Sequence, residues 1–299
     1  MASPQTGIFA LGTMSHAYLE LDKRPEADWS ALVRTVASLR EPRTTIGGVN
    51  LVAGFRPELW AAVAPTAAPP GLIGFTQPVV GAGGYTLPAT QHDIVVWLAG
   101  AAYDVVFDLS RGVMAALAPY ATLEHEIVGW PYHRDLDLTG FEDGTENPTL
   151  VEATTAAILE PGTPGEGGSV LLLQQWEHDA TSWETLPTVE QELVMGRRKL
   201  DGKELDPRPG TSHVARTDQE RFGQIFRRNI GYGTLAHHGT IFVGFSRDRD
   251  RLDAMLDSMV GRADGSRDRL TDFAHAVTGA YYFVPSAEAL ATFAAESTD

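Results

Sequence analysis

The chain has 299 residues, of which 43% are hydrophobic and 21% are charged, a composition typical of folded globular domains. Its formal net charge of −16 repels phosphate backbones and anionic lipid surfaces, which argues against nucleic-acid and membrane binding. The chain contains no cysteine, which excludes disulfides, zinc–thiolate sites and a thiolate ligand to iron. No segment approaches the roughly 20 apolar residues of a membrane span, and no export signal is recognisable, so we expect a cytoplasmic location.

Apolar periodicity in the first half predicts four strands and two helices in the order β-α-β-β-α-β. The first strand is expected to be an edge strand, and Asp28 is expected to cap the first helix. A long loop rich in Pro and Gly is expected at residues 64–88. In chain order, the elements are expected at residues 7–21, 28–39, 48–55, 93–99, 103–117 and 121–130.

The second half repeats this pattern without repeating the sequence. Strands and helices are expected at residues 169–176, 183–198, 240–245, 248–260 and 279–284. Because the strands do not alternate one for one with helices, a doubly wound parallel sheet is disfavoured. The pattern instead predicts an α+β fold of two ferredoxin-like halves, residues 1–147 and 148–299, joined by a linker near residues 148–168.

The segment GFEDGTENP, residues 140–148, interrupts the pattern between the two halves. Its two glycines, one proline and three acidic residues predict a tight exposed loop. Such a loop can be a solvated linker, or its glycines can let the backbone approach a flat ligand closely. The acidic residues lack the spacing of an EF-hand calcium loop.

Nine histidines are present, and none forms the HExxH pair of a zinc hydrolase. His213 stands apart because it follows the turn-rich run DPRPGTS and precedes the compact stretch VARTD. Fourteen positions further on lies the arginine-containing segment around Arg227. Since imidazoles commonly have structural roles, these residues alone leave a ligand role and a structural role for His213 open.

Three segments together resemble the dye-decolorizing peroxidase family, in particular its shorter bacterial B-type or P-type members. GFEDGTENP matches the family's GxxDG haem loop, with Asp143 in the defining position. TSHVARTD is similar to the proximal-histidine segment, which implies that His213 is the iron ligand. IFRRNIGYG is similar to the distal-arginine segment, which implies catalytic roles for Arg227 and Asn229.

The resemblance also implies a cofactor, haem b, held in the C-terminal half of a fold like that of the dimeric α+β barrels. The first half would end in the haem loop. Arg197, in GRRKLDG, matches an arginine close to a haem propionate. The further residues expected against the cofactor or its ligand are Phe141, Glu142, Gly144, Thr145, Phe242, Phe245 and Asp268.

The implied reaction reduces hydrogen peroxide through a ferryl intermediate and oxidises dyes, phenols or other small aromatic donors. Asp143 can accept and return the peroxide proton, and its ordinary pKa of about 3.9 predicts best activity in mild acid unless burial raises that value. Arg227 stays charged and can stabilise developing negative charge. We expect Arg227 to be essential and Asp143 to assist. Of the two carboxylates that could orient His213, Asp268 is preferred over Asp272.

Other functions fit the same residues less well. A porphyrinogen oxidase or deferrochelatase would use the same haem site on a different substrate. A haem carrier would need no distal acid–base pair such as Asp143 and Arg227, and a ferredoxin-like module without haem would show no Soret band. We expect the chain to form a homo-oligomer.

Overall fold

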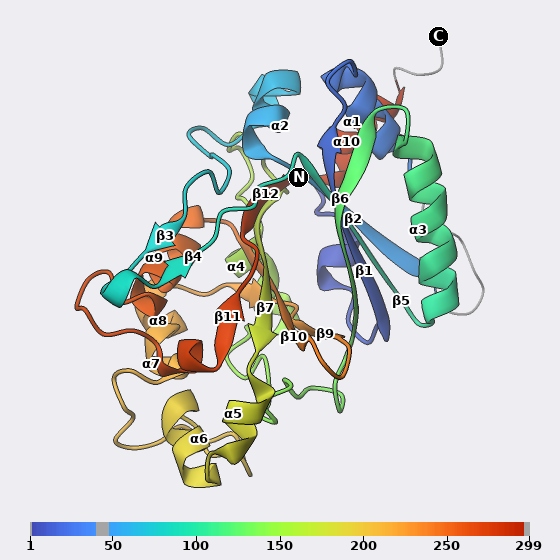
Figure 1. Ribbon diagram of the computed structural model, residues 1–299. Coiled ribbons are helices and arrows are strands. Elements are labelled where there is room, and N and C mark those ends of the chain that lie inside the picture. The colour runs from blue at the N-terminus through green and yellow to red at the C-terminus, as the bar shows by residue number, and fades with distance from the viewer. Residues whose placement is uncertain (1, 40–47, 296–299) are drawn as a thin grey trace.

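The computed structural model describes residues 2–39 and 48–295, and it is organised around one antiparallel sheet that closes on itself (Figure 1). The strand order is β11-β7-β12-β2-β5-β1-β6-β9-β10-β8, and β10 also pairs with β7. That last pairing joins the strands from β7 to β10 into a barrel, while β11 and β8 extend it. Closure leaves few unpaired strand edges, which is how barrels avoid edge-to-edge association.

The six strands and helices expected in the first half are present, but the first strand begins at Ser15 rather than at residue 7, and the loop expected at residues 64–88 contains two short strands. Asp28 accepts a hydrogen bond from the Ala31 N–H at 2.8 Å and caps the first helix. The first strand is not an edge strand, however, because it lies between two others and is buried along most of its length. The elements are β1 (Ser15–Lys23), α1 (Trp29–Ser38), β2 (Val49–Phe55), α2 (Pro57–Val63), β3 (Val79–Val80), β4 (Thr86–Leu87), β5 (Ile94–Gly100), α3 (Tyr103–Leu117) and β6 (Ala121–Trp130).

The second half contains the expected long strands and several short elements that were not expected. The helix expected at 183–198 is split in two, because Pro187 has no N–H to donate and disfavours helical geometry at Leu186. The elements are α4 (Leu150–Ala157), β7 (Ser169–His178), α5 (Ala180–Thr185), α6 (Thr188–Met195), α7 (His213–Arg216), α8 (Gln219–Phe222), β8 (Phe226–Arg227), β9 (Ile230–Gly233), β10 (His238–Ser246), α9 (Arg249–Met259), β11 (Ala274–Ala276), β12 (Ala280–Val284) and α10 (Ala287–Ala295).

Both halves follow the ferredoxin-like order, as β1-α1-β2-β5-α3-β6 and β7-α6-β9-β10-α9-β12. The fold is therefore the expected α+β class, with the two halves joined through the β6–β9 and β12–β2 pairings. The division between residues 147 and 148 stays a prediction. Over the described residues, no helix combines the length and the apolar character needed to span a bilayer.

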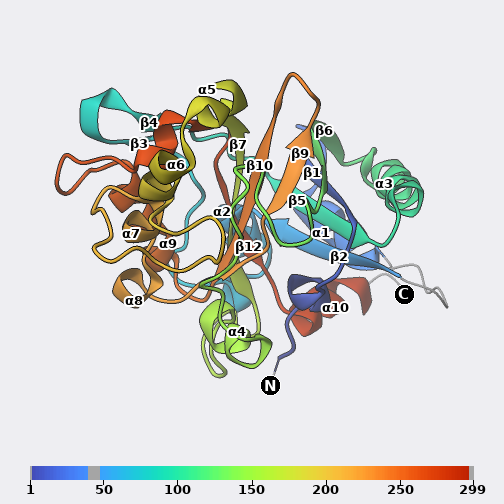
Figure 2. The ribbon, with the colours of Figure 1, turned by 90° about the horizontal axis from the view of Figure 1, so that it is seen from below.

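Alternate residues of β10 face opposite sides of the barrel wall. Ile241, Val243 and Phe245 point inward, where they join a core that includes Trp97 and Tyr18. Thr240 and Phe242 point outward, toward the space below α7, α8 and α9. Figures 1 and 2 show these helices gathered on one side of β7 and β10, with α1 and α3 on the far side of the barrel. The outer face of β7 and β10 is thus covered mainly by helices of the second half, together with the loop that carries Phe141 to Glu146.

Candidate active site

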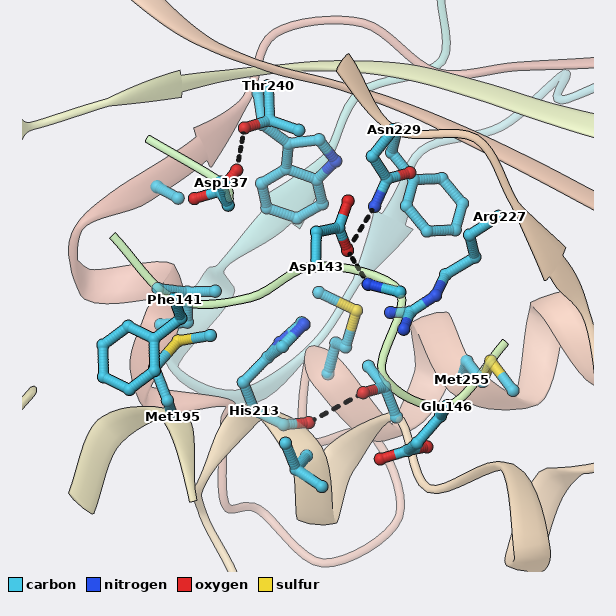
Figure 3. Close-up of a pocket in the computed structure, with 18 of the residues that line it drawn as sticks. Asp137, Phe141, Asp143, Glu146, Met195, His213, Arg227, Asn229, Thr240 and Met255 are labelled. Atoms are coloured by element: carbon cyan, nitrogen blue, oxygen red, sulfur yellow. Dashed lines mark hydrogen bonds between the residues drawn. The ribbon is translucent and has the colours of Figure 1, made fainter. Parts of the chain in front are cut away.

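A cavity lies between the outer face of β7 and β10 and the helices that cover it (Figure 3). It measures about 1220 Å³, including the part open to solvent. Its walls are mostly apolar, with polar side chains converging from two sides. The apolar part of the lining comprises Phe141, Leu172, Trp176, Met195, Val214, Ile225, Phe242, Leu252, Met255, Leu256, Met259, Leu270 and Ala274.

His213 enters the cavity from the first position of α7. Its Nδ1 atom lies 2.7 Å from Oδ2 of Asp268, whose side chain is completely buried. Burial opposes protonation of the imidazole, but the Asp268 carboxylate outweighs it and raises the pKa of His213. The Nε2 atom has no hydrogen-bond partner among residues 2–39 and 48–295, and Figure 3 shows the ring pointing into the cavity. His213 is therefore oriented by a carboxylate and has one ring nitrogen free for a ligand.

Two local contacts bring Asp268 to His213 although they are 55 residues apart. Asp268 caps a 3-10 helix at Arg269–Asp272, its Oδ1 accepting the Leu270 N–H at 2.9 Å. The Arg269 N–H donates to the carbonyl of Thr211 at 2.9 Å, which joins the two segments side by side. Asp272 instead pairs with Arg267 at the surface. The geometry agrees with the preference for Asp268.

Asp143 faces the cavity from the loop between the halves, on the side opposite His213 (Figure 3). Its Oδ1 accepts the Gly144 N–H at 2.7 Å and the Asn229 Nδ2 at 3.3 Å. Gly144 adopts φ +71°, a left-handed conformation that favours glycine and turns the chain below the carboxylate. Burial raises the pKa of Asp143, and the nearby charge of Arg227 opposes part of this rise. The free atom Oδ2 is the one available to a ligand.

Arg227 and Asn229 reach the same side of the cavity from β8 and the residues after it. The Asn229 amide has a defined orientation, because its Oδ1 accepts the Val243 N–H at 3.2 Å while its Nδ2 donates to Asp143. The Nε atom of Arg227 is buried without a hydrogen-bond partner in the described part of the chain. The same holds for Nε2 of Gln174, which also lines the cavity. Unpaired buried donors are costly, and a bound polar ligand would satisfy them.

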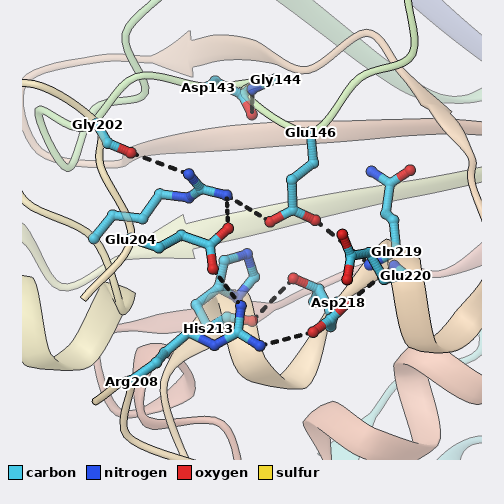
Figure 4. A network of polar contacts seen from close by, with 12 residues as sticks. Asp143, Gly144, Glu146, Gly202, Glu204, Arg208, His213, Asp218, Gln219 and Glu220 are labelled. Carbon is cyan, nitrogen blue, oxygen red and sulfur yellow. Dashed lines mark hydrogen bonds and ion pairs between the residues drawn. The ribbon is translucent and has the colours of Figure 1, made fainter. Parts of the chain in front are cut away.

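A network of charged side chains extends from the cavity lining, starting at Glu146 (Figure 4). Arg197 lines the cavity and donates to Glu146 at 2.7 Å and to Glu204 at 2.9 Å. Arg208 extends the network, with contacts of 2.9 Å to Glu204 and 2.7 Å to Asp218. Arg197 thus lines the cavity, and its guanidinium is already engaged by two carboxylates of this chain; its place beside a propionate stays a prediction.

The remaining expected contacts fall into two groups. Phe141 is buried and lines the cavity beside Trp183, and Glu142 and Thr145 line its exposed rim. Phe242 lines the cavity, but Phe245 points into the barrel core, where its ring centre lies 6.1 Å from that of Trp97. The expectation that Phe245 contacts a cofactor is therefore wrong, because residues three apart on a strand face opposite sides.

Sequence reasoning missed a second set of lining residues. Leu172, Gln174, Trp176 and His178 occupy alternate positions of β7 and form the floor of the cavity. The period-two spacing was the available signal, but it could not show which face of β7 would be covered. Asp137 was also missed; it lines the cavity and accepts a hydrogen bond from Thr240 of β10.

Comparison with known proteins identifies the class to which this fold and site belong. Residues 134–289 match the family model described as Dyp-type peroxidase, C-terminal. Dye-decolorizing peroxidases of Mycolicibacterium paratuberculosis and Rhodococcus erythropolis are 33% and 34% identical to this chain over 88% of its length. The alignments cover 75% and 79% of those two proteins. The chain belongs to the Dyp-type peroxidase family.

Solved structures show the same likeness over nearly the whole chain. A DypB variant of Rhodococcus jostii in complex with heme is 33% identical, with a TM-score of 0.88 over 97% of this chain and 99% of that one. A dye-decolorizing peroxidase of Bacteroides thetaiotaomicron is 26% identical, with a TM-score of 0.89 over 98% of this chain and 99% of that one. The similarity therefore includes the first half, beyond the segment that matches the family model.

Proposed function

We propose that this chain is a haem peroxidase of the dye-decolorizing type, which reduces hydrogen peroxide and oxidises small organic donors. The observation that carries the proposal is the arrangement of one mainly apolar cavity between His213 and the group formed by Asp143, Arg227 and Asn229. An orienting carboxylate on one imidazole nitrogen and a free second nitrogen suit a metal ligand. Apolar walls suit a porphyrin face, so the residues fit haem b.

In this proposal His213 would hold the iron, and Phe242, Phe141, Glu142, Gly144 and Thr145, which line the cavity, would contact the porphyrin. Arg197 would reach a propionate if it exchanged one of its carboxylate partners, Glu146 or Glu204. Asp268 accepts a hydrogen bond from the His213 Nδ1–H and keeps the other nitrogen electron-rich. Bound haem supplies the two electrons that reduce the peroxide and regains them from the organic donor.

The chain's own residues move one proton between the two peroxide oxygens. Oδ2 of Asp143 takes one proton from hydrogen peroxide and returns it to the departing oxygen, which leaves as water. Arg227 stays protonated and stabilises the negative charge that develops while the O–O bond breaks. Asn229 holds Oδ1 of Asp143, so that Oδ2 faces the substrate. We propose that Arg227 contributes more to the rate than Asp143, because the charge of Arg227 needs no change of protonation state.

The test is stopped-flow reaction of haem-loaded protein with hydrogen peroxide, comparing wild type with Asp143→Ala and Arg227→Ala. Both variants should react more slowly, with the larger loss in Arg227→Ala. A larger loss in Asp143→Ala would reverse the proposed order. Wild-type rates in both variants would reject the proposed site. Assays with porphyrinogen, and for iron release from haem, would show whether another haem reaction is faster.

The homo-oligomer, the cytoplasmic location and the absence of nucleic-acid partners expected from the sequence stay predictions. The net charge of −16 supports the last of them, since it disfavours contact with phosphate backbones. A sedimentation experiment would test the homo-oligomer, and a gel-shift assay at low salt would test the absence of nucleic-acid binding.

A further inference from the structure

β8 is an edge strand of two residues, Phe226 and Arg227. Among residues 2–39 and 48–295 it pairs only with β10, through Phe226 opposite Phe245 and Arg227 opposite Gly244. In an antiparallel ladder, the N–H and C=O of one residue point either both toward the partner strand or both away from it. The N–H of Arg228 donates to the Val243 carbonyl of β10 at 2.8 Å. The backbone groups of Arg227 therefore point away from β10 and need partners elsewhere.

The side chain of Asn147 supplies both partners. Its Oδ1 accepts the Arg227 N–H at 2.9 Å, and its Nδ2 donates to the Arg227 carbonyl at 2.9 Å. At Arg227 the amide thus makes the two backbone hydrogen bonds that a neighbouring strand would otherwise make. One contact needs an acceptor and the other a donor, and the asparagine amide supplies one of each. The orientation of the amide is determined by the same two contacts.

Asn147 belongs to the loop that carries Asp143. Its own N–H donates to the Gly144 carbonyl at 2.8 Å and closes the turn that follows Asp143. A Cβ atom on Gly144 would lie 3.1 Å from Asn147 Nδ2, so the turn packs directly against the amide. The other direct bond between the two segments, from Asn229 Nδ2 to Asp143 Oδ1, is longer at 3.3 Å. Asn147 is therefore the closer link between Asp143 and Arg227.

We propose that Asn147 is a positioning residue for the peroxide site, holding Arg227 and the Asp143 loop in one arrangement through the Arg227 backbone. This inference rests on the proposed function. Asn147 does not itself reach the reacting atoms in this account, since both ends of its amide are engaged by the backbone of Arg227. Its effect on peroxide chemistry should therefore depend on the presence of the Arg227 guanidinium.

The loop is also held to the sheet at a second place, so that the loss of Asn147 can change the position of Arg227 without unfolding the loop. At the other end of the loop, Asp137 accepts hydrogen bonds from Thr240 of β10 and from the Thr139 N–H. Loss of the Asn147 amide leaves this attachment intact. The expected result is a native barrel in which the edge of β8 is loosened at Arg227.

A double-mutant cycle on the haem-loaded protein tests the inference. Asn147→Ala should slow the reaction with peroxide at least about tenfold, because small misplacements of a catalytic group cost rates of this order. In the Arg227→Ala background, the same change should slow the reaction less than about twofold if Asn147 acts through Arg227. Equal factors in both backgrounds, or no slowing in the wild-type background, would overturn the inference. If Arg227→Ala alone reacts at the wild-type rate, the proposed role of Arg227 fails, and the inference fails with it.

Cyanide binding to the resting protein gives a readout apart from turnover. The charge of Arg227 favours a bound anion, so Asn147→Ala and Arg227→Ala should both weaken cyanide binding, and the double variant should be no weaker than Arg227→Ala. Asn50→Ala is the matched control, because Asn50 also donates to a backbone carbonyl, that of Ala99 at 3.4 Å, within the first half. It should bind cyanide as the wild type does. Wild-type affinity in Asn147→Ala would overturn the inference.

Asn147→Asp provides a nearly isosteric variant if Asn147→Ala does not fold with haem. An ionised carboxylate can still accept the Arg227 N–H but repels the Arg227 carbonyl, whereas a protonated one can donate to it. The peroxide rate of this variant, divided by that of the wild type at the same pH, should therefore increase as the pH falls. A ratio that does not change with pH would overturn the proposal that Asn147 positions Arg227 through both hydrogen bonds.

Discussion

The bond between His213 and Asp268 yields a prediction that can be worked out from its geometry. The carboxylate accepts two separate hydrogen bonds, at Oδ2 from His213 Nδ1 and at Oδ1 from the Leu270 N–H. Asparagine has one acceptor oxygen, so Asp268→Asn must give up one contact. Whichever contact is lost, the substitution removes the negative charge of Asp268. If His213 ligates iron, it then becomes a weaker electron donor, and the iron(III)/iron(II) midpoint potential should rise.

The size of this rise has an upper limit. A hydrogen bond to a charged group contributes about 1.5–3 kcal/mol, and a one-electron couple shifts by about 59 mV for each factor of ten, or about 1.4 kcal/mol. Loss of the whole interaction from the oxidised state alone would therefore raise the potential by about 65–130 mV. Because the reduced state loses part of the same interaction, the expected rise is several tens of millivolts.

Spectroelectrochemical titration of the haem-loaded proteins measures this shift. Asp272→Asn is the control, since Asp272 lies in the same 3-10 helix but pairs with Arg267 at the surface. Its potential should equal that of the wild type. An unchanged or lower potential in Asp268→Asn would refute the reasoning that Asp268 acts on the iron through His213.

Three further predictions concern Asp143, Arg227 and the two phenylalanines of β10. Burial raises the pKa of Asp143 above its ordinary value near 3.8. The wild-type rate constant for the reaction with peroxide should therefore be high above the raised pKa and should fall as the pH drops through it. In Asp143→Asn, stopped-flow measurements should show no such fall at acid pH. The charge of Arg227 opposes the rise in the pKa of Asp143, so Arg227→Leu should move the acid fall in rate to higher pH. A shift to lower pH would contradict this effect of the Arg227 charge on Asp143. Phe245→Ala should lower the free energy of unfolding by about 3–5 kcal/mol in denaturant titrations, whereas Phe242→Ala should mainly weaken haem binding in haem titrations.

Much of the fold could be predicted because its long elements carry their own periodicity. The strand of residues 94–100 is a continuous apolar run, and the helix of residues 103–117 has apolar residues at helical spacing. The short strands β8, β9 and β11 could not be predicted, because two to four residues show no period. They are strands through pairing with β10, β6 and β7, which is a tertiary effect.

The candidate site was predicted mainly through motifs, and the error at Phe245 shows what motifs omit. The strand period would have separated Phe242 from Phe245 without a structure, since residues three apart cannot face the same side. The partners of Arg197 could not be predicted in the same way. Glu146 lies 51 positions away in sequence, and only the folded chain brings it within 2.7 Å.

The central claim is that His213 binds haem iron in this cavity. Its most direct test is the absorption spectrum of His213→Gly, purified with haem, before and after addition of imidazole. We expect a Soret band in the wild type, a lost or displaced band in the variant, and recovery when imidazole occupies the space left by the ring. A wild-type spectrum in His213→Gly without imidazole would contradict ligation by His213, because another residue would then hold the iron.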